Sequence, residues 1–147
     1  MPKIMKDMNI ISRCQLSYRS EMIKDGILGC HHSFVLAICR LPGMSQDEIA
    51  RELCINKSTV ARALTQLEND GYVRREQKLE DKRSVLVYPT DKMMEILPTV
   101  REITDKWNEM ISEGISEKEL EIFVSVLGKM SDKARKITQK REGVVEK

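Results

Sequence analysis

Apolar residues recur at intervals of three and four along most of this chain, the spacing that places them on one face of a helix. One such run covers residues 4–22, and a second, more apolar run covers residues 31–41 until a Pro-Gly pair interrupts it. Another run covers residues 91–113, and Pro98 inside it predicts a kink or a restart of that helix. The pattern therefore predicts a mainly α protein.

The last apolar run, residues 116–141, begins at a capping box, because Ser116 is followed three residues later by Glu119. Behind the box, apolar positions alternate intervals of three and four: Leu120, Phe123, Leu127, Met130, Ala134 and Ile137. Such a sustained stripe requires a partner helix. Residues 140–147 are expected to fray.

Between these long helices, residues 45–71 predict two short helices joined by a brief turn. Ser45 and Glu48 form a second capping box, which predicts a helix from Gln46 to about Leu53. Cys54 and Ile55 then make a turn, and Asn56 caps a helix that continues to Asp70 and closes at Gly71. The spacing of the two helices is that of a helix-turn-helix.

After Gly71 the period changes from 3.6 to 2, which predicts a β-hairpin. Its strands are residues 72–79 and 83–88, with a polar turn at residues 80–82. Pro89 is expected to end the second strand, and Thr90 is expected to cap the helix that follows.

The second short helix, in the stretch INKSTVARALTQLENDGY, has two different faces. Val60, Leu64 and Leu67 form the face that is buried. The opposite face carries short polar side chains and cations rather than long Glu/Lys pairs: Lys57, Ser58, Thr59, Ala61, Arg62, Thr65 and Gln66. Short side chains let a helix enter a DNA major groove, roughly 12 Å wide, and Arg and Gln suit guanine and adenine edges.

The hairpin adds cations, and an arginine at its tip suits a narrow minor groove. Charge on a hairpin is also common simply as a solvated surface. The residues predicted to contact DNA are Ser45, Lys57, Ser58, Thr59, Ala61, Arg62, Thr65, Gln66, Arg75, Asp81, Lys82 and Arg83. Which bases they read does not follow from the sequence.

Composition fits one soluble domain with a substantial core. The 147 residues are 41% hydrophobic and 33% charged, with a formal net charge of +2 that does not identify a partner. No apolar run approaches the roughly 18 to 20 residues of a membrane span, and the N-terminus lacks the apolar stretch of a secretory signal, so we expect a cytoplasmic protein.

Neither a cofactor nor a metal site is predicted, and no enzyme. The four cysteines are widely spaced, without a CxxC pair. Cys30, His31 and His32 are adjacent, but neighbouring residues on a helix diverge by about 100° and cannot all reach one metal ion. The two histidines have no evident catalytic partner.

Taken together, these motifs resemble the MarR family of winged helix-turn-helix regulators over nearly the whole chain. The resemblance rests on residues 45–53, 56–64, 67–68, 71–75 and, above all, Asp81-Lys82-Arg83-Ser84 at the hairpin tip. It implies a mainly α fold with a small β-hairpin wing, in which a winged helix-turn-helix is flanked by N- and C-terminal dimerisation helices. It also implies that Arg83 enters the minor groove and that Asp81 helps to hold it.

The resemblance further implies one MarR-like domain over residues 1–147, in which residues 4–22 and 116–141 dimerise, residues 31–90 form the winged helix-turn-helix and residues 91–113 connect them. The homodimer would bind a pseudo-palindromic operator in double-stranded DNA, more often as a repressor. A protein-interaction winged helix without DNA affinity stays open as an alternative.

Two kinds of signal are candidates for releasing such a protein from DNA. Family members often respond to a small aromatic acid or lipophile bound between the dimer helices and the winged domain, and four residues are candidates for such a pocket: Tyr18, His32, Phe34 and Arg74. Ordinary packing explains each of these residues as well. The alternative is a peroxide sensor that uses Cys14, which has Arg13 beside it.

Overall fold

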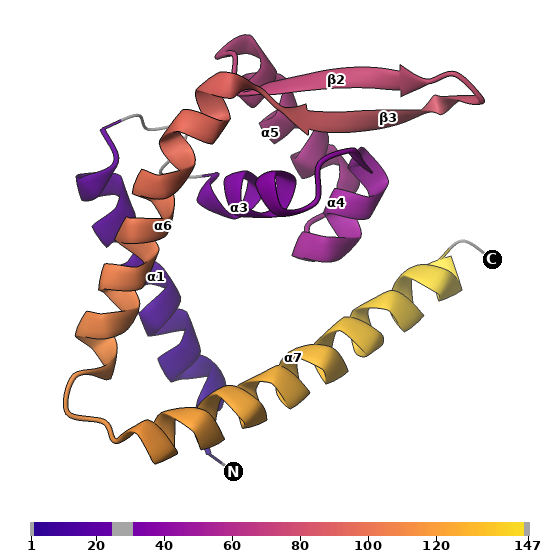
Figure 1. Cartoon of the computed structure of the whole chain (residues 1–147). Coiled ribbons are helices and arrows are strands. Elements are labelled where there is room, and N and C mark those ends of the chain that lie inside the picture. Colours follow the sequence, from indigo (N-terminus) through magenta and orange to yellow (C-terminus); the bar gives the residue numbers. More distant parts are fainter. Residues whose placement is uncertain (1, 25–30, 146–147) are drawn as a thin grey trace. The chain divides into compact units, whose positions relative to one another are not determined.

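The computed structural model describes residues 2–24 and 31–145, except for the side chains of Lys82 and residues 141–145. The chain divides into two compact units, Met1–Trp107 and Asn108–Lys147. In order along the chain, the elements are α1 (Ile4–Met22), α3 (His32–Arg40), β1 (Met44–Ser45), α4 (Gln46–Leu53), α5 (Lys57–Asn69), β2 (Val73–Lys78), β3 (Asp81–Pro89), α6 (Asp91–Ser112) and α7 (Glu117–Val145). All of them except β1 are labelled in Figure 1.

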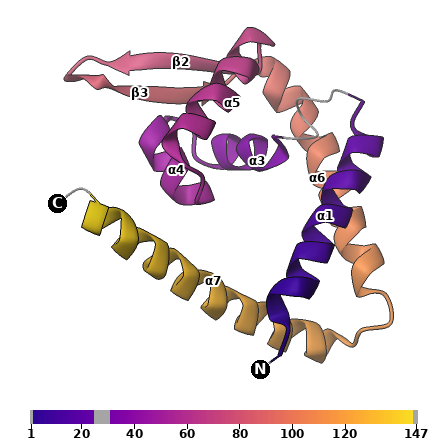
Figure 2. The same cartoon turned by 180° about the vertical axis from the view of Figure 1, so that it is seen from behind.

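The core of the first unit joins the helix-turn-helix to the sheet and to α6. Its largest side chains that are less than 2% exposed come from five helices and strands: Val35, Ile38, Ile49, Val60, Leu64, Leu67, Val87, Met93 and Val100. The buried face predicted for α5 is therefore confirmed. Figures 1 and 2 show the β2–β3 hairpin extending beyond the helices that it packs on.

The sheet has three antiparallel strands in the order β1-β3-β2, one more than the sequence predicts. The additional strand, β1, pairs Met44 with Val87 and Ser45 with Leu86. Two residues carry no readable period, so only the pairing reveals this strand. It leads directly into α4, because Ser45 is also the N-cap of that helix.

The turn of the hairpin lies earlier than predicted. Lys78 pairs with Asp81, so Leu79 and Glu80 make the turn, and the predicted turn at residues 80–82 is wrong. The register shifts after Gln77, which leaves the residues that follow Asp81 in an irregular part of the strand. The carboxylate of Asp81 binds backbone there, which holds Asp81 in the strand rather than in the turn.

Local helix signals are largely confirmed. Helix α1 has the predicted bounds, α3 is one residue shorter at each end, and α4 and α5 begin at their predicted caps. The Thr90 hydroxyl accepts from the Met93 amide at 3.4 Å, as expected for a cap. Among the described helices, none is both long and apolar enough to cross a membrane.

The structure tests two expectations about the long helices. Helix α6 continues through Pro98, with Leu97 and Val100 on either side buried in the core, so the predicted restart is wrong and the predicted kink stays a prediction. Helix α7 extends to Val145, so residues 140–145 are helical rather than frayed, and residues 146 and 147 lie outside the described residues. The capping box that starts α7 is confirmed, because the Glu119 amide donates to the Ser116 hydroxyl at 3.3 Å.

Candidate nucleic-acid interface

The turn between α4 and α5 brings the two helices into close contact. Cys54 adopts a left-handed conformation with a φ of 51°, and the Ile55 amide donates to the Ala50 carbonyl at 3.0 Å. Ala50 is 6% exposed and Val60 is fully buried. The small side chain of Ala50 allows the close crossing that a helix-turn-helix requires.

The N-terminus of α5 is organised by Asn56. Its side-chain oxygen accepts from the Thr59 amide at 2.8 Å and from the Ser58 hydroxyl at 2.9 Å. The Lys57 ammonium lies 3.8 Å from an Asp47 carboxylate oxygen, and the Lys57 side chain is 69% exposed. A long, exposed ion pair contributes little, so Lys57 remains available to an anion at this helix end.

The face of α5 that the sequence assigns to DNA is accessible to solvent. Arg62 and Gln66 are exposed, while Ala61 is partly buried. The Arg62 guanidinium donates to the Thr59 hydroxyl at 3.4 Å, a long bond that a base edge could replace. The Gln66 carbonyl oxygen lies 3.1 Å from Nε2 of His31, a contact that the sequence did not indicate.

Arg75, also predicted to contact DNA, is held by the protein itself. Its Nε and Nη2 donate to one carboxylate oxygen of Glu68 at 3.3 and 3.0 Å, and its amide donates to the other at 3.1 Å. Nη1 donates to the Gln46 side chain at 3.1 Å, and Nη2 also donates to the Thr65 hydroxyl at 3.3 Å. These hydrogen bonds lower the pKa of Glu68. Arg75 thus joins β2 to both helices of the helix-turn-helix.

At the hairpin tip, Asp81 binds the main chain near Arg83. The Arg83 amide donates to one carboxylate oxygen at 3.0 Å, and the Ser84 hydroxyl donates to the other at 3.4 Å. The Arg83 side chain is exposed, and the Lys82 side chain lies outside the described residues. Asp81 thereby stabilises the backbone that carries Arg83.

Comparisons with known proteins identify this arrangement. The family model described as MarR family matches residues 32–85. The transcriptional regulator HosA of Escherichia coli O157:H7 is 33% identical over 99 residues, which cover 67% of this chain and 73% of that protein. The chain belongs to the MarR family. It is therefore a transcriptional regulator and not an enzyme.

Solved structures of MarR proteins have the same fold. A MarR protein from Peptoclostridium difficile has a TM-score of 0.91 and 26% identity, covering 95% of this chain and 92% of its own. A putative MarR family regulator from Listeria monocytogenes, solved in complex with a 26mer DNA, has a TM-score of 0.89 and 23% identity, covering 97% and 96%. The mainly α, winged helix-turn-helix fold class is thus confirmed.

Three of the four residues predicted for an effector pocket in this MarR protein make packing contacts within the chain. Tyr18 stacks on Trp107, with ring centroids 5.4 Å apart, and Phe34 is buried in the core. Arg74 lies over the Tyr88 ring, 4.7 Å from its centroid, and pairs with the Glu76 carboxylate. Each of these residues has a packing contact within the chain, and its effector role stays a prediction.

His32 forms a link between α3 and α1. Nη1 of Arg19 lies 2.8 Å from Nε2 of His32, and since a guanidinium can only donate, this ring nitrogen accepts. Burial, with a smaller contribution from the Arg19 charge, lowers the pKa of His32 to about 4. The folded protein therefore holds His32 in its neutral form.

The neutral form of His32 predicts how stability depends on pH. Unfolding restores the ordinary pKa of 6.5, so between pH 6.5 and about 4 only the unfolded state takes up this proton. The contribution of neutral His32 to the free energy of unfolding should therefore be fully present above pH 6.5 and should be lost as the pH falls toward 4. Denaturation midpoints measured in that window should decline more for the wild type than for His32→Gln. His31→Gln serves as the control and should decline like the wild type; equal slopes for all three proteins would contradict the prediction.

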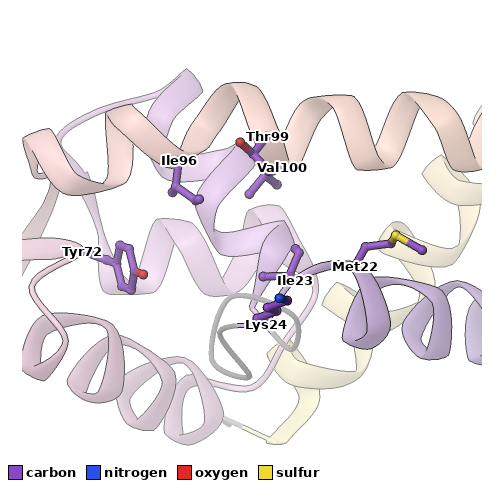
Figure 3. Close-up of a pocket in the computed structure, with 7 residues that line it drawn as sticks. All are labelled: Met22, Ile23, Lys24, Tyr72, Ile96, Thr99 and Val100. Atoms are coloured by element: carbon purple, nitrogen blue, oxygen red, sulfur yellow. The ribbon is translucent and has the colours of Figure 1, made fainter.

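A cavity of about 240 Å³ lies between the end of α1, the start of β2 and α6, shown in Figure 3. It is lined by Met22, Ile23, Lys24, Tyr72, Ile96, Thr99 and Val100. Ile96 and Val100 face it from α6, opposite Ile23 and Tyr72. No local sequence pattern marks these residues, because three separate segments contribute them.

The cysteines that the structure describes are free thiols that differ in exposure. Cys14 and Cys54 are exposed free thiols, and burial raises the pKa of the partly buried Cys39. Cys30 lies outside the described residues. Within residues 2–24 and 31–145, no group of three His, Cys, Asp or Glu side chains is close enough to hold a metal ion. A redox role for Cys14 stays a hypothesis.

Proposed function

We propose that this MarR protein is a cytoplasmic repressor that binds a pseudo-palindromic operator as a homodimer and is released by a small aromatic or lipophilic effector. The observation that carries the proposal is the exposed polar face of α5, on a helix-turn-helix joined to a hairpin with an exposed Arg83. The DNA complex of the Listeria relative supports it by analogy of fold.

The proposed DNA contacts follow from the chemistry of each position. The first turn of α5 offers Lys57 and free backbone amides to phosphates, which fix register without reading sequence. Arg62 is the best candidate for a paired contact to guanine. Arg83, carried on backbone held by Asp81, is proposed to enter the adjacent minor groove, where negative potential attracts arginine.

A homodimer is proposed because two helices carry large apolar side chains that the single chain leaves exposed. On α1 these are Ile4, Met5, Met8, Ile10, Ile11, Leu16 and Met22. On α7 they are Ile122, Phe123, Val124, Val126 and Ile137. A two-fold dimer would bury such surface and present two copies of α5 to half-sites about one helical turn apart.

Selection of bound sequences from random duplex DNA by the purified protein tests the central proposal. A regulator should return a palindromic motif, and its affinity should fall steeply as the salt concentration rises. A protein-interaction module would return no motif and show weak, salt-insensitive retention of DNA. That result would overturn the proposed function.

The cavity beside Tyr72 is the proposed effector site. Its lining is mainly apolar, with polar groups on Lys24, Tyr72 and Thr99, so small aromatic acids and neutral aromatics such as benzoate and indole are suitable probes. A ligand that fits should weaken operator binding by about 5- to 150-fold, the usual range of coupling between two sites. In that case Thr99→Phe, which fills the rim, should abolish the effect, while Asp105→Phe on the same helix should preserve it. An effect that survives Thr99→Phe would place the site elsewhere.

A further inference from the structure

The hydroxyl of Thr65 makes two hydrogen bonds within the protein. It donates to the Ala61 carbonyl at 2.9 Å and accepts from Nη2 of Arg75 at 3.3 Å. A hydroxyl has one hydrogen and two lone pairs, so its only donor and one of its acceptor sites are occupied. Thr65 is nonetheless an exposed residue on the outward face of α5. With the hydroxyl engaged in this way, the methyl group is the main part of the side chain left for a contact with DNA.

Arg75 is well suited to select this orientation. Threonine in a helix divides between two χ1 rotamers, because either can bring the hydroxyl to a carbonyl one turn earlier. The Arg75 guanidinium lies in a fixed plane set by Glu68 on one side and Gln46 on the other. Its side chain is only 23% exposed. A donor held in this way favours the one rotamer whose oxygen faces it.

We propose that Arg75 is a positioning residue that turns the methyl group of Thr65 outward, so that this position of α5 recognises the 5-methyl group of thymine. The inference rests on the proposed DNA-binding function. Ala61 lies one helical turn earlier on the same face and adds a second methyl group, which makes an apolar spot beside the polar Arg62 and Gln66. Thymine is the one base that offers a methyl group in the major groove.

The proposed role of Arg75 differs from a direct contact between arginine and DNA. An Arg75 that bound phosphate would contribute to the salt dependence of affinity, whereas a positioning Arg75 contributes to the choice of base. The remaining lone pair of Thr65 offers a competing mode, in which the hydroxyl accepts from an amino group of adenine or cytosine. Separate replacement of the methyl and hydroxyl groups distinguishes these modes.

The test replaces thymine by deoxyuridine, one position at a time, in the operator obtained by selection. Deoxyuridine lacks only the 5-methyl group, so the ratio of the two dissociation constants measures recognition of that group. We expect one thymine in each half-site whose replacement weakens binding about fourfold, as for a buried methyl group. Thr65→Val should keep this ratio, because it retains a methyl group without the hydroxyl, and Thr65→Ser should bring it to one.

Arg75→Lys tests the positioning role, because lysine keeps the charge but lacks the planar fork. The thymine-to-deoxyuridine ratio should fall toward one in Arg75→Lys and stay at the wild-type value in Arg74→Lys, a matched change on the same strand. A measurement on the wild type avoids any loss of folding: coupling constants of the Thr65 methyl group should report a single χ1 rotamer.

Several outcomes would overturn the proposal. These are ratios near one at every thymine, a ratio unchanged in Thr65→Ser, an unchanged ratio in Arg75→Lys, or averaged rotamers in the wild type. In each case a recovered palindromic operator would leave the proposed function standing. Failure to select any motif would instead remove the function and this inference with it.

Discussion

Phe123→Glu combined with Ile137→Glu in α7 is expected to give a monomer that binds the operator at least about 100-fold more weakly than the wild type. The two side chains are 55% and 59% exposed in the single chain and lie on one apolar stripe of the helix. Charges there would have to be desolvated in a dimer. A monomer loses the effective concentration by which one bound half-site assists the other, typically worth 10²- to 10⁴-fold.

The matched control places the same charges on the opposite face of the same helix. Ser125→Glu combined with Gln139→Glu should remain dimeric and bind like the wild type. Sedimentation equilibrium would give the assembly state, circular dichroism would check that the helix is retained, and titration with operator would give affinity. A double Phe123 and Ile137 variant that stays dimeric would show that α7 is not an essential dimer surface, and a monomer of full affinity would remove the dimer from the mechanism.

The second large effect is expected from Arg62→Ala, at one base pair. Loss of a paired arginine contact costs about 1 to 3 kcal/mol and should relax specificity at that position, because nothing then distinguishes guanine from the other bases. Affinities for a set of operators, each with one base pair changed, would locate the position. At that position a changed base pair should weaken binding by the wild type strongly and binding by Arg62→Ala only slightly.

Lys57→Ala provides the contrasting behaviour on the same helix. Its ammonium is exposed and only loosely paired with Asp47 at 3.8 Å. A phosphate contact carries no sequence information, so Lys57→Ala should weaken binding to all operators alike and reduce the slope of log affinity against log salt by about one. Uniform weakening by Arg62→Ala, with an unchanged base preference, would exclude it as a base-reading residue.

The elements that were predicted correctly from the sequence are those with local causes. Ser45 and Ser116 each mark a helix start with a glutamate three residues later, and both capping boxes form. Asn56 caps α5, and the buried stripe of that helix follows from its period alone. A cap and a stripe depend on residues within a few positions, so one stretch of sequence contains all the information.

The features that were missed depend on distant partners. Strand β1 exists because Met44 meets Val87, and the sequence between them gives no sign of it. Helix α6 does not restart at Pro98 because core packing of Leu97 and Val100 outweighs the lost hydrogen bond. The sequence predicted Arg75 as a cation of the DNA-binding surface, but it did not predict the hydrogen bond to Gln46, 29 positions away. The cavity beside Tyr72 likewise needs three segments to be folded together.

Asp81 binds the backbone amide of Arg83, so the shape of the wing tip does not depend on the Arg83 side chain. Any residue except proline offers that amide, so a substitution at position 83 should preserve the contact that shapes the hairpin tip. If Arg83 reads the minor groove as proposed, substitutions at this position should change the preference for flanking sequence while the hairpin tip keeps its backbone.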